Sequence, residues 1–208
     1  MTKNIIFDCF LPPNKSGENS LEILKIANHS KLQKNIKKRF LHTLWSLDLS
    51  YRKLSFDEFN KIISKLQYLR NIQTLIISSY FQIIDRLISA SKLHITTLEI
   101  INEELHEKDF TTDILNQFAK FNPYLLHTIK LKKCKINKQC IVSLNKLKNL
   151  RSLSFEKVEG LSNTLIRQIS LNNLNLLAII DNDEFDDNTC MHIIKKNKLL
   201  IVSQYCFD

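Results

Sequence analysis

Residues 126–136 read LHTIKLKKCKI, and this stretch decides the fold. Its apolar residues Leu126, Ile129 and Leu131 are followed by Cys134 and Ile136. They match the spacing L-x-x-L-x-L-x-x-N/C-x-L at every position, and the central residues of that spacing mark a short strand with one apolar face. The sequence therefore predicts a short strand around Ile129 and Leu131, followed by a turn at Cys134.

Copies of this spacing recur along the chain. Residues 174–182 repeat it with Asn182 at the N/C position, and residues 44–54 repeat it with Arg52 there. The second apolar position of the copies falls at Leu47, Leu75, Leu98, Ile129, Leu153, Leu177 and Leu200. Successive positions are 28, 23, 31, 24, 24 and 23 residues apart, mostly within the roughly 20–29 residues of known leucine-rich repeats. The step of 31 residues predicts a loop insertion before Ile129.

Between these strands the apolar residues change to helical spacing. After the first copy, apolar residues at three- and four-residue intervals run from Phe56 to Leu69, and shorter stripes follow the later copies. The side chains suited to begin these helices as N-caps are Thr112, Asn137, Ser162 and Asp187. Pro123 is placed to end the third helix. Each unit is therefore predicted to be a strand, a turn and a helix.

A helix in every unit resembles the ribonuclease-inhibitor-like class of leucine-rich-repeat proteins. The resemblance covers residues 44–208 and implies an α/β leucine-rich-repeat solenoid of about six to seven repeats. In such a solenoid a curved parallel sheet lines the concave side and helices line the convex side. Members of this class bind very different proteins, so the resemblance implies a protein-interaction module without defining the partner.

Residues 1–43 differ in character, and an end repeat needs a cap that covers its core. An N-terminal helical cap is expected, with helices over residues 20–26 and 36–41. The alternative is a degenerate F-box, because residues 11–13 (LPP) and 22–24 (EIL) precede the first repeat in the order seen in F-box proteins with leucine-rich repeats. That resemblance implies a substrate adaptor of a ubiquitin ligase that binds a Skp1-type linker.

Charge and cysteine content limit which partners and which cellular compartment are expected. The chain has 30 Lys and Arg against 21 Asp and Glu, a formal charge of +9, which suits an acidic protein or nucleic acid but also arises in AT-rich genomes. The five cysteines form no CxxC pair, so reduced thiols and a cytoplasmic protein are expected. The protein is expected to be a monomer. No signal peptide or membrane span is predicted. A bacterial effector that acts on a host protein in the host cytosol is the alternative.

Motifs for catalysis and cofactor binding are missing from the sequence. Two glycines cannot build a Walker loop or a dinucleotide fingerprint. The acidic run 181–187 lacks the glycine of a calcium loop, and residues 103–107 lack HExxH spacing. We therefore predict no catalytic residue, no metal site, no cofactor and no enzymatic activity.

Functional residues are expected where strand side chains point away from the core. Lys130, Lys132 and Arg151 predict a basic centre among apolar residues, a mixture that favours a protein over nucleic acid, for which a continuous basic stripe is expected. Nucleic acid remains the less favoured alternative, through the lysine clusters 31–39 and 130–138. Trp45 is either an anchor for the partner or a residue packed under the cap. The predicted partner-binding residues are Trp45, Asp48, Ile76, Glu99, Lys130, Lys132, Arg151, Glu156 and Ile180.

Overall fold

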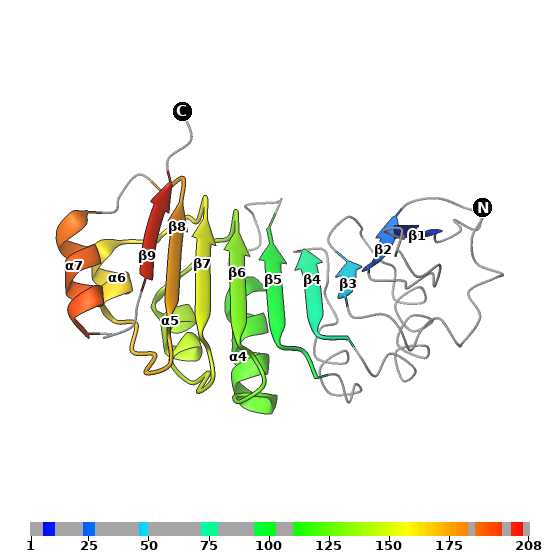
Figure 1. The fold of residues 1–208 in the computed structure, drawn as a ribbon, viewed down its shortest axis with the longest axis horizontal. Coiled ribbons are helices and arrows are strands. Elements are labelled where there is room, and N and C mark those ends of the chain that lie inside the picture. Colours follow the sequence, from blue (N-terminus) through cyan, green and yellow to red (C-terminus); the bar gives the residue numbers. More distant parts are fainter. Residues whose placement is uncertain are drawn as a thin grey trace, which may run out of the picture. The chain divides into compact units, whose positions relative to one another are not determined.

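The computed structural model describes residues 6–10, 23–27, 46–49, 72–78, 94–102, 110–182, 186–196 and 201–205 (Figure 1). The chain divides into two compact units, residues 1–95 and residues 96–208. Trp45, the lysine cluster at 31–39 and the helix expected over 36–41 lie outside the described residues. We describe each unit by itself.

The described residues of the first unit form four short strands. Strands β1 (Ile6–Phe10) and β2 (Ile23–Ala27) pair antiparallel. Strand β2 then pairs parallel with β3 (Ser46–Leu49), and β3 pairs parallel with β4 (Thr74–Ser78). Leu47, Leu75 and Ile77, which carry the repeat spacing, are fully buried. The spacing therefore marks core strands in this unit.

Strand β2 corrects the prediction of a helix over residues 20–26. Residues 23–27 are extended and pair with β1 on one side and β3 on the other. Ile23 and Ile26 are β-branched and fit a strand, and two neighbouring strands supply backbone hydrogen bonds that local helical spacing does not reveal. Ile23 and Leu24 also belong to the segment that suggested an F-box, and both lie in this strand.

The second unit confirms the prediction of an α/β fold in which short parallel strands alternate with helices. Its strands pair parallel and lie side by side in chain order (Figure 1). The strands are β5 (Thr97–Ile101), β6 (Thr128–Lys132), β7 (Ser152–Glu156), β8 (Leu176–Ile180) and β9 (Ile201–Tyr205). The helices are α4 (Phe110–Phe121), α5 (Lys138–Leu144), α6 (Asn163–Arg167) and α7 (Asp187–Lys196).

These helices cover one face of the sheet. Parallel strands that follow one another in chain order need crossovers of one hand, which place every helix on the same side. In Figure 1, α4 and α5 lie behind the sheet. Helix-facing strand residues such as Leu98, Ile129, Leu153 and Leu177 are fully buried, whereas the residues between them are partly exposed. The core therefore lies between the sheet and the helices.

The turns after β6, β7 and β8 have the same backbone conformation. Lys133, Lys157 and Asp181 stand 24 residues apart, directly after each strand, with φ of 52°, 51° and 50°. A left-handed conformation is uncommon for residues other than glycine. Its recurrence at a fixed interval shows that these three turns are built alike.

The side chain at the N/C position of the spacing forms hydrogen bonds with backbone groups. Asn182 accepts a hydrogen bond from Val158 N at 2.8 Å and donates to Ile180 O at 2.8 Å and Phe155 O at 3.3 Å. The Cys134 thiol lies 3.3–3.4 Å from the carbonyl oxygens of Ile100 and Lys132. Each side chain therefore joins its own turn to the preceding strand and turn.

Two of the four predicted N-caps are confirmed. Asn137 caps α5 by accepting from Cys140 N, and Ser162 caps α6 by accepting from Leu165 N. For α7 the prediction is wrong by one residue, because Asp186 accepts from Thr189 N at 2.6 Å.

Thr112 is not an N-cap, because α4 already begins at Phe110. Its buried hydroxyl lies 3.0 Å from Cys140 Sγ and accepts a hydrogen bond from Asn137 Nδ2 at 3.3 Å. It therefore joins α4 to the start of α5.

Candidate interaction surface

The strand face of the second unit is the side of β5–β8 that no described helix covers. The strand register aligns its side chains in rows across the sheet. One row runs Glu99, Lys130, Ser154 and Ala178, and all four side chains are partly or fully exposed. The full set is Thr97, Glu99, Ile101, Thr128, Lys130, Lys132, Ser152, Ser154, Glu156, Leu176, Ala178 and Ile180.

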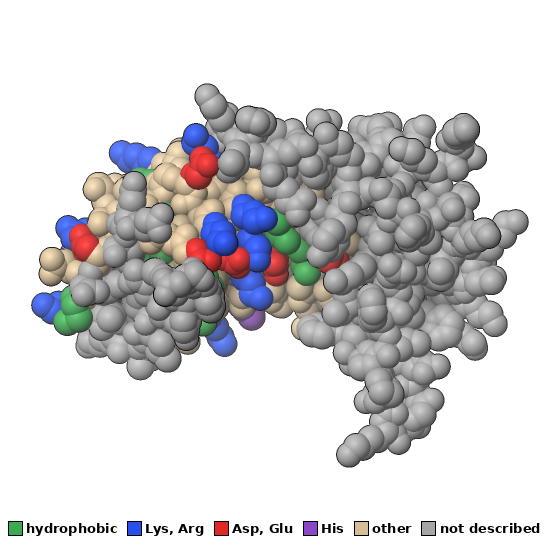
Figure 2. Space-filling view, turned by 90° about the horizontal axis from the view of Figure 1, so that it is seen from above, with side chains coloured by type: hydrophobic (Ala, Val, Ile, Leu, Met, Phe, Trp, Pro, Cys, Tyr) green, Lys and Arg blue, Asp and Glu red, His purple; other side chains and the backbone are tan. Residues whose placement is uncertain are grey.

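Acidic and basic side chains lie next to one another near the ends of these strands. Figure 2 views the molecule from above, the end toward which the strands point, and shows both signs gathered in one place. Lys157 and Asp181, in the turns after β7 and β8, are 3.5 Å apart, and Lys135 and Glu159 are 3.9 Å apart. This end of the described sheet therefore carries paired charges.

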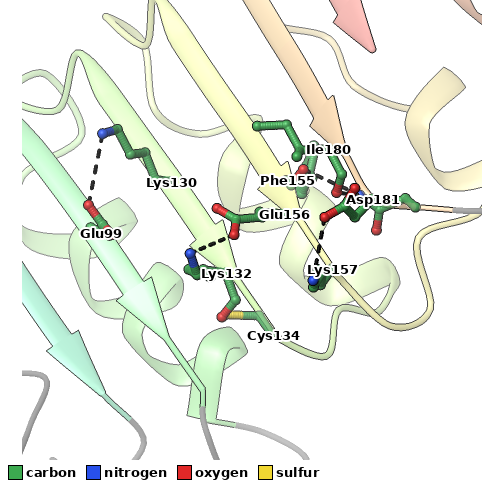
Figure 3. Close-up of polar contacts among 10 residues, drawn as sticks. Glu99, Lys130, Lys132, Cys134, Phe155, Glu156, Lys157, Ile180 and Asp181 are labelled. Carbon is green, nitrogen blue, oxygen red and sulfur yellow. Dashed lines mark hydrogen bonds and ion pairs between the residues drawn. The ribbon is translucent and has the colours of Figure 1, made fainter. Parts of the chain in front are cut away.

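The strand face itself carries two ion pairs between neighbouring strands (Figure 3). Lys130 Nζ lies 3.9 Å from Glu99 Oε2, and Lys132 Nζ lies 2.5 Å from Glu156 Oε1. Opposite charges on adjacent strands are favourable cross-strand neighbours. Because such exposed pairs contribute at most about 1 kcal/mol, their main effect is to set the charge pattern of the surface. Both lysines of the predicted basic centre thus face carboxylates.

Apolar side chains complete the strand face. Leu176 is 37% exposed, and Ile101 and Ile180 are half-buried. In the register Leu176 lies beside Ser152, and Ile180 lies beside Glu156. Apolar side chains therefore lie beside polar or charged ones in the rows of this face.

The predicted partner-binding residues fall into different places. Glu99, Lys130, Lys132, Glu156 and Ile180 lie together on the strand face, and Arg151 is exposed directly before β7. Two others belong to the first unit: Ile76 is half-buried, and Asp48 is only 4% exposed.

The ion pairs were within reach of the sequence but were not predicted. Aligning the copies on Leu98, Ile129 and Leu153 places Glu99 beside Lys130, since the strand register follows these markers. The same alignment places Lys132 beside Glu156.

Burial makes the Cys134 thiol a weak acid. Desolvation raises the pKa of this thiol to about 11, against a partial lowering by hydrogen bonds from its neighbours. Since the thiolate is the reactive form, Cys134 is expected to be inert as a nucleophile. Because Cys134 lies inside the turn, its role is structural packing.

Among the described residues, Asp186 is the other group whose pKa is clearly shifted. Hydrogen bonds from Thr189 and the nearby Arg167 guanidinium lower the pKa of this carboxyl. The contact therefore favours the fold above the ordinary pKa of an aspartate, and this contribution is lost as the pH falls through the lowered value. Asp186 acts as a helix cap.

The described residues bring together no group of three His, Cys, Asp or Glu side chains that could hold a metal ion. Within the same parts of the chain, no helix is long and apolar enough to span a membrane.

No protein-family model and no curated protein matches this chain.

Proposed function

We propose that this chain is a leucine-rich-repeat protein of the ribonuclease-inhibitor-like class, whose strand face binds a partner protein and which has no catalytic activity. Features that recur at 24-residue intervals support the repeat. The three left-handed turns are one such feature. A hydrogen bond is another: Asn149 Nδ2 donates to Tyr124 O at 2.7 Å, and Asn173 Nδ2, 24 residues later, donates to Lys148 O at 2.8 Å. Bonding of each unit to its sequence neighbours is typical of repeat proteins.

The observation that carries the proposed function is the composition of the strand face. It combines the ion pairs Lys130–Glu99 and Lys132–Glu156 with the exposed side chain of Leu176. Interfaces between proteins mix apolar and polar contacts in this way, and their charges choose among partners more than they add affinity. A phosphate backbone would instead favour lysines that no carboxylate neutralises.

Ala178→Arg tests this proposal at the middle of the strand face. Ala178 lies in register between Ser154 and Ser203, so a long charged side chain there would obstruct a partner seated on the sheet. We expect capture of the partner to fall at least about tenfold, because an unmatched charge in an interface costs several kcal/mol. The partner is identified by photo-crosslinking from a reactive residue at position 154, and its capture is measured by quantitative mass spectrometry.

The matched control is Thr164→Arg, at an exposed position on α6. It adds the same side chain on the helix side of the sheet and is expected to leave capture unchanged. Both variants should melt within a few degrees of the unmodified protein. Equal capture by the two arginine variants would contradict binding through the strand face.

A further inference from the structure

A second surface lies at the edge of the second unit where its strands begin. We call it the strand-start edge, and define it by the end of α4 and the segments that precede β6 and β7. It carries four basic and two aromatic side chains. They are Lys120, Phe121, Tyr124, Lys146, Lys148 and Arg151.

Within the described part of the chain, no carboxylate forms an ion pair with the basic groups of this edge. Residues 114–155 include no Asp or Glu. None of its four basic side chains forms an ion pair with another described residue, whereas Lys132, Lys135 and Lys157 near the strand ends each lie within 4 Å of a carboxylate. The two ends of the described sheet therefore differ in charge, and only the strand-start edge is purely basic.

Two aromatic rings stand among these charges. Phe121 is 46% exposed and Tyr124 is 63% exposed. Lys120 Nζ lies 4.9 Å from the centre of the Phe121 ring, within the range of a cation–π contact. The ring of Tyr124 is the more open of the two, and its segment lies beside the segment that carries Lys148.

Hydrogen bonds hold the segments of this edge side by side. Lys148 N donates to Pro123 O at 2.8 Å, and Asn149 Nδ2 donates to Tyr124 O at 2.7 Å. Asn173 Nδ2 in turn donates to Lys148 O at 2.8 Å. Since these hydrogen bonds fix the backbone next to Tyr124 and Lys148, the edge is ordered before a ligand binds.

From this arrangement we infer that the strand-start edge binds single-stranded nucleic acid, a function separate from that of the strand face. Its lysines and Arg151 contact phosphates, and a base stacks on Tyr124. Cationic side chains beside open aromatic rings are the features that bind single strands without sequence preference. A duplex stacks its bases on one another and leaves no face for Tyr124, and an acidic peptide has carboxylates but no flat bases.

The test is fluorescence anisotropy with a labelled 12-nucleotide oligouridylate and the full chain. Four phosphate contacts on a single strand give a slope of about −3 for the logarithm of affinity against the logarithm of salt concentration. Affinity should therefore fall about 50-fold between 50 and 200 mM salt. A same-length RNA duplex should bind more weakly, and unlabelled oligouridylate should compete.

Variants separate the charges from the ring. Lys146→Gln with Lys148→Gln should lower the salt slope by about 1.4. The control is the pair Lys133→Gln and Lys138→Gln, two exposed lysines that follow the other end of β6. Tyr124→Ala should weaken binding at least about fivefold at an unchanged slope, because stacking is lost. Tyr124→Phe should retain affinity, and circular dichroism checks each fold.

Several results would overturn the inference. Absence of binding at 50 mM salt is one, and an equal loss in the Lys133 and Lys138 control pair is another. Duplex binding as tight as single-strand binding, with no effect of Tyr124→Ala, would show only general attraction for polyanions. Competition by polyglutamate as effective as that by oligouridylate would instead assign the edge to an acidic protein segment.

Discussion

Phe155→Ala is expected to lower the free energy of unfolding by about 3–5 kcal/mol, the usual cost of removing a buried aromatic side chain. Phe155 is fully buried in β7 and points toward the helices. In the register it lies between Leu131 and Ile179, whose side chains are also buried. Because ordered strands surround the site on both sides, the cavity left by the ring should collapse only partly.

The preceding residue supplies the control. Ser154 lies on the opposite face of the same strand, so Ser154→Ala should change the free energy of unfolding by no more than about 0.5 kcal/mol. Urea unfolding followed by circular dichroism measures both variants. Similar losses at positions 154 and 155 would show that β7 does not have one buried and one open face.

Gly160→Ala is expected to destabilise the protein by about 2–4 kcal/mol, through backbone strain and a steric clash. Gly160 has φ of +75°, a conformation that costs an L-residue energy. An added Cβ would also lie 2.5 Å from Ile136 O. That oxygen belongs to backbone held by the hydrogen bond from Ile136 N to Glu159 O, so it cannot rotate away as a side chain would.

Glu159→Ala is the matched control for this substitution. Glu159 is exposed, and its carboxylate lies 3.9 Å from Lys135, so removing it should cost at most about 1 kcal/mol. The comparison uses urea midpoints at constant slope. A Gly160→Ala variant as stable as Glu159→Ala would mean that the turns after β6 and β7 are not packed backbone against backbone.

The core strands were predictable because the sequence carries their periodicity. Leu153 and Phe155 alternate with polar residues, and the same spacing returns at Leu177 and Ile179. The alternation of apolar residues within a strand and the fixed interval between strands both indicate the same buried face of the sheet. Pro123 likewise lies just beyond the end of α4 at Phe121, as predicted.

Other features depend on residues distant in sequence. Strand β2 pairs with β1 and β3, so its extended backbone is decided by partners that local spacing does not include. The N-cap of α7 is Asp186 rather than the predicted Asp187. The sequence could not distinguish them, because adjacent aspartates are chemically alike and only the position of the helix start separates their roles. Local patterns therefore predict that an element exists better than they predict its boundary.

Charge counts along the chain misrepresent the surface for a similar reason. Lys130 and Lys132 belong to a basic cluster in the sequence, but their carboxylate partners Glu99 and Glu156 lie on neighbouring strands. Conversely, Tyr124 lies 24 residues before Lys148 in the sequence, and the two segments come together only through the stacking of adjacent units. Register and fold decide which charges are neutralised.

Cysteine accessibility along β7 tests most directly whether the strand face is open to a partner. Ser152→Cys, Leu153→Cys and Ser154→Cys are each alkylated at pH 8 in the native state and in 8 M urea, with peptide-resolved mass spectrometry. Native Cys134, buried with a pKa of about 11, is the slow internal reference. We expect rapid native labelling at positions 152 and 154 and labelling at least about tenfold slower at 153. Labelling at 154 as slow as at 153 would contradict this expectation, because the strand face would then be covered.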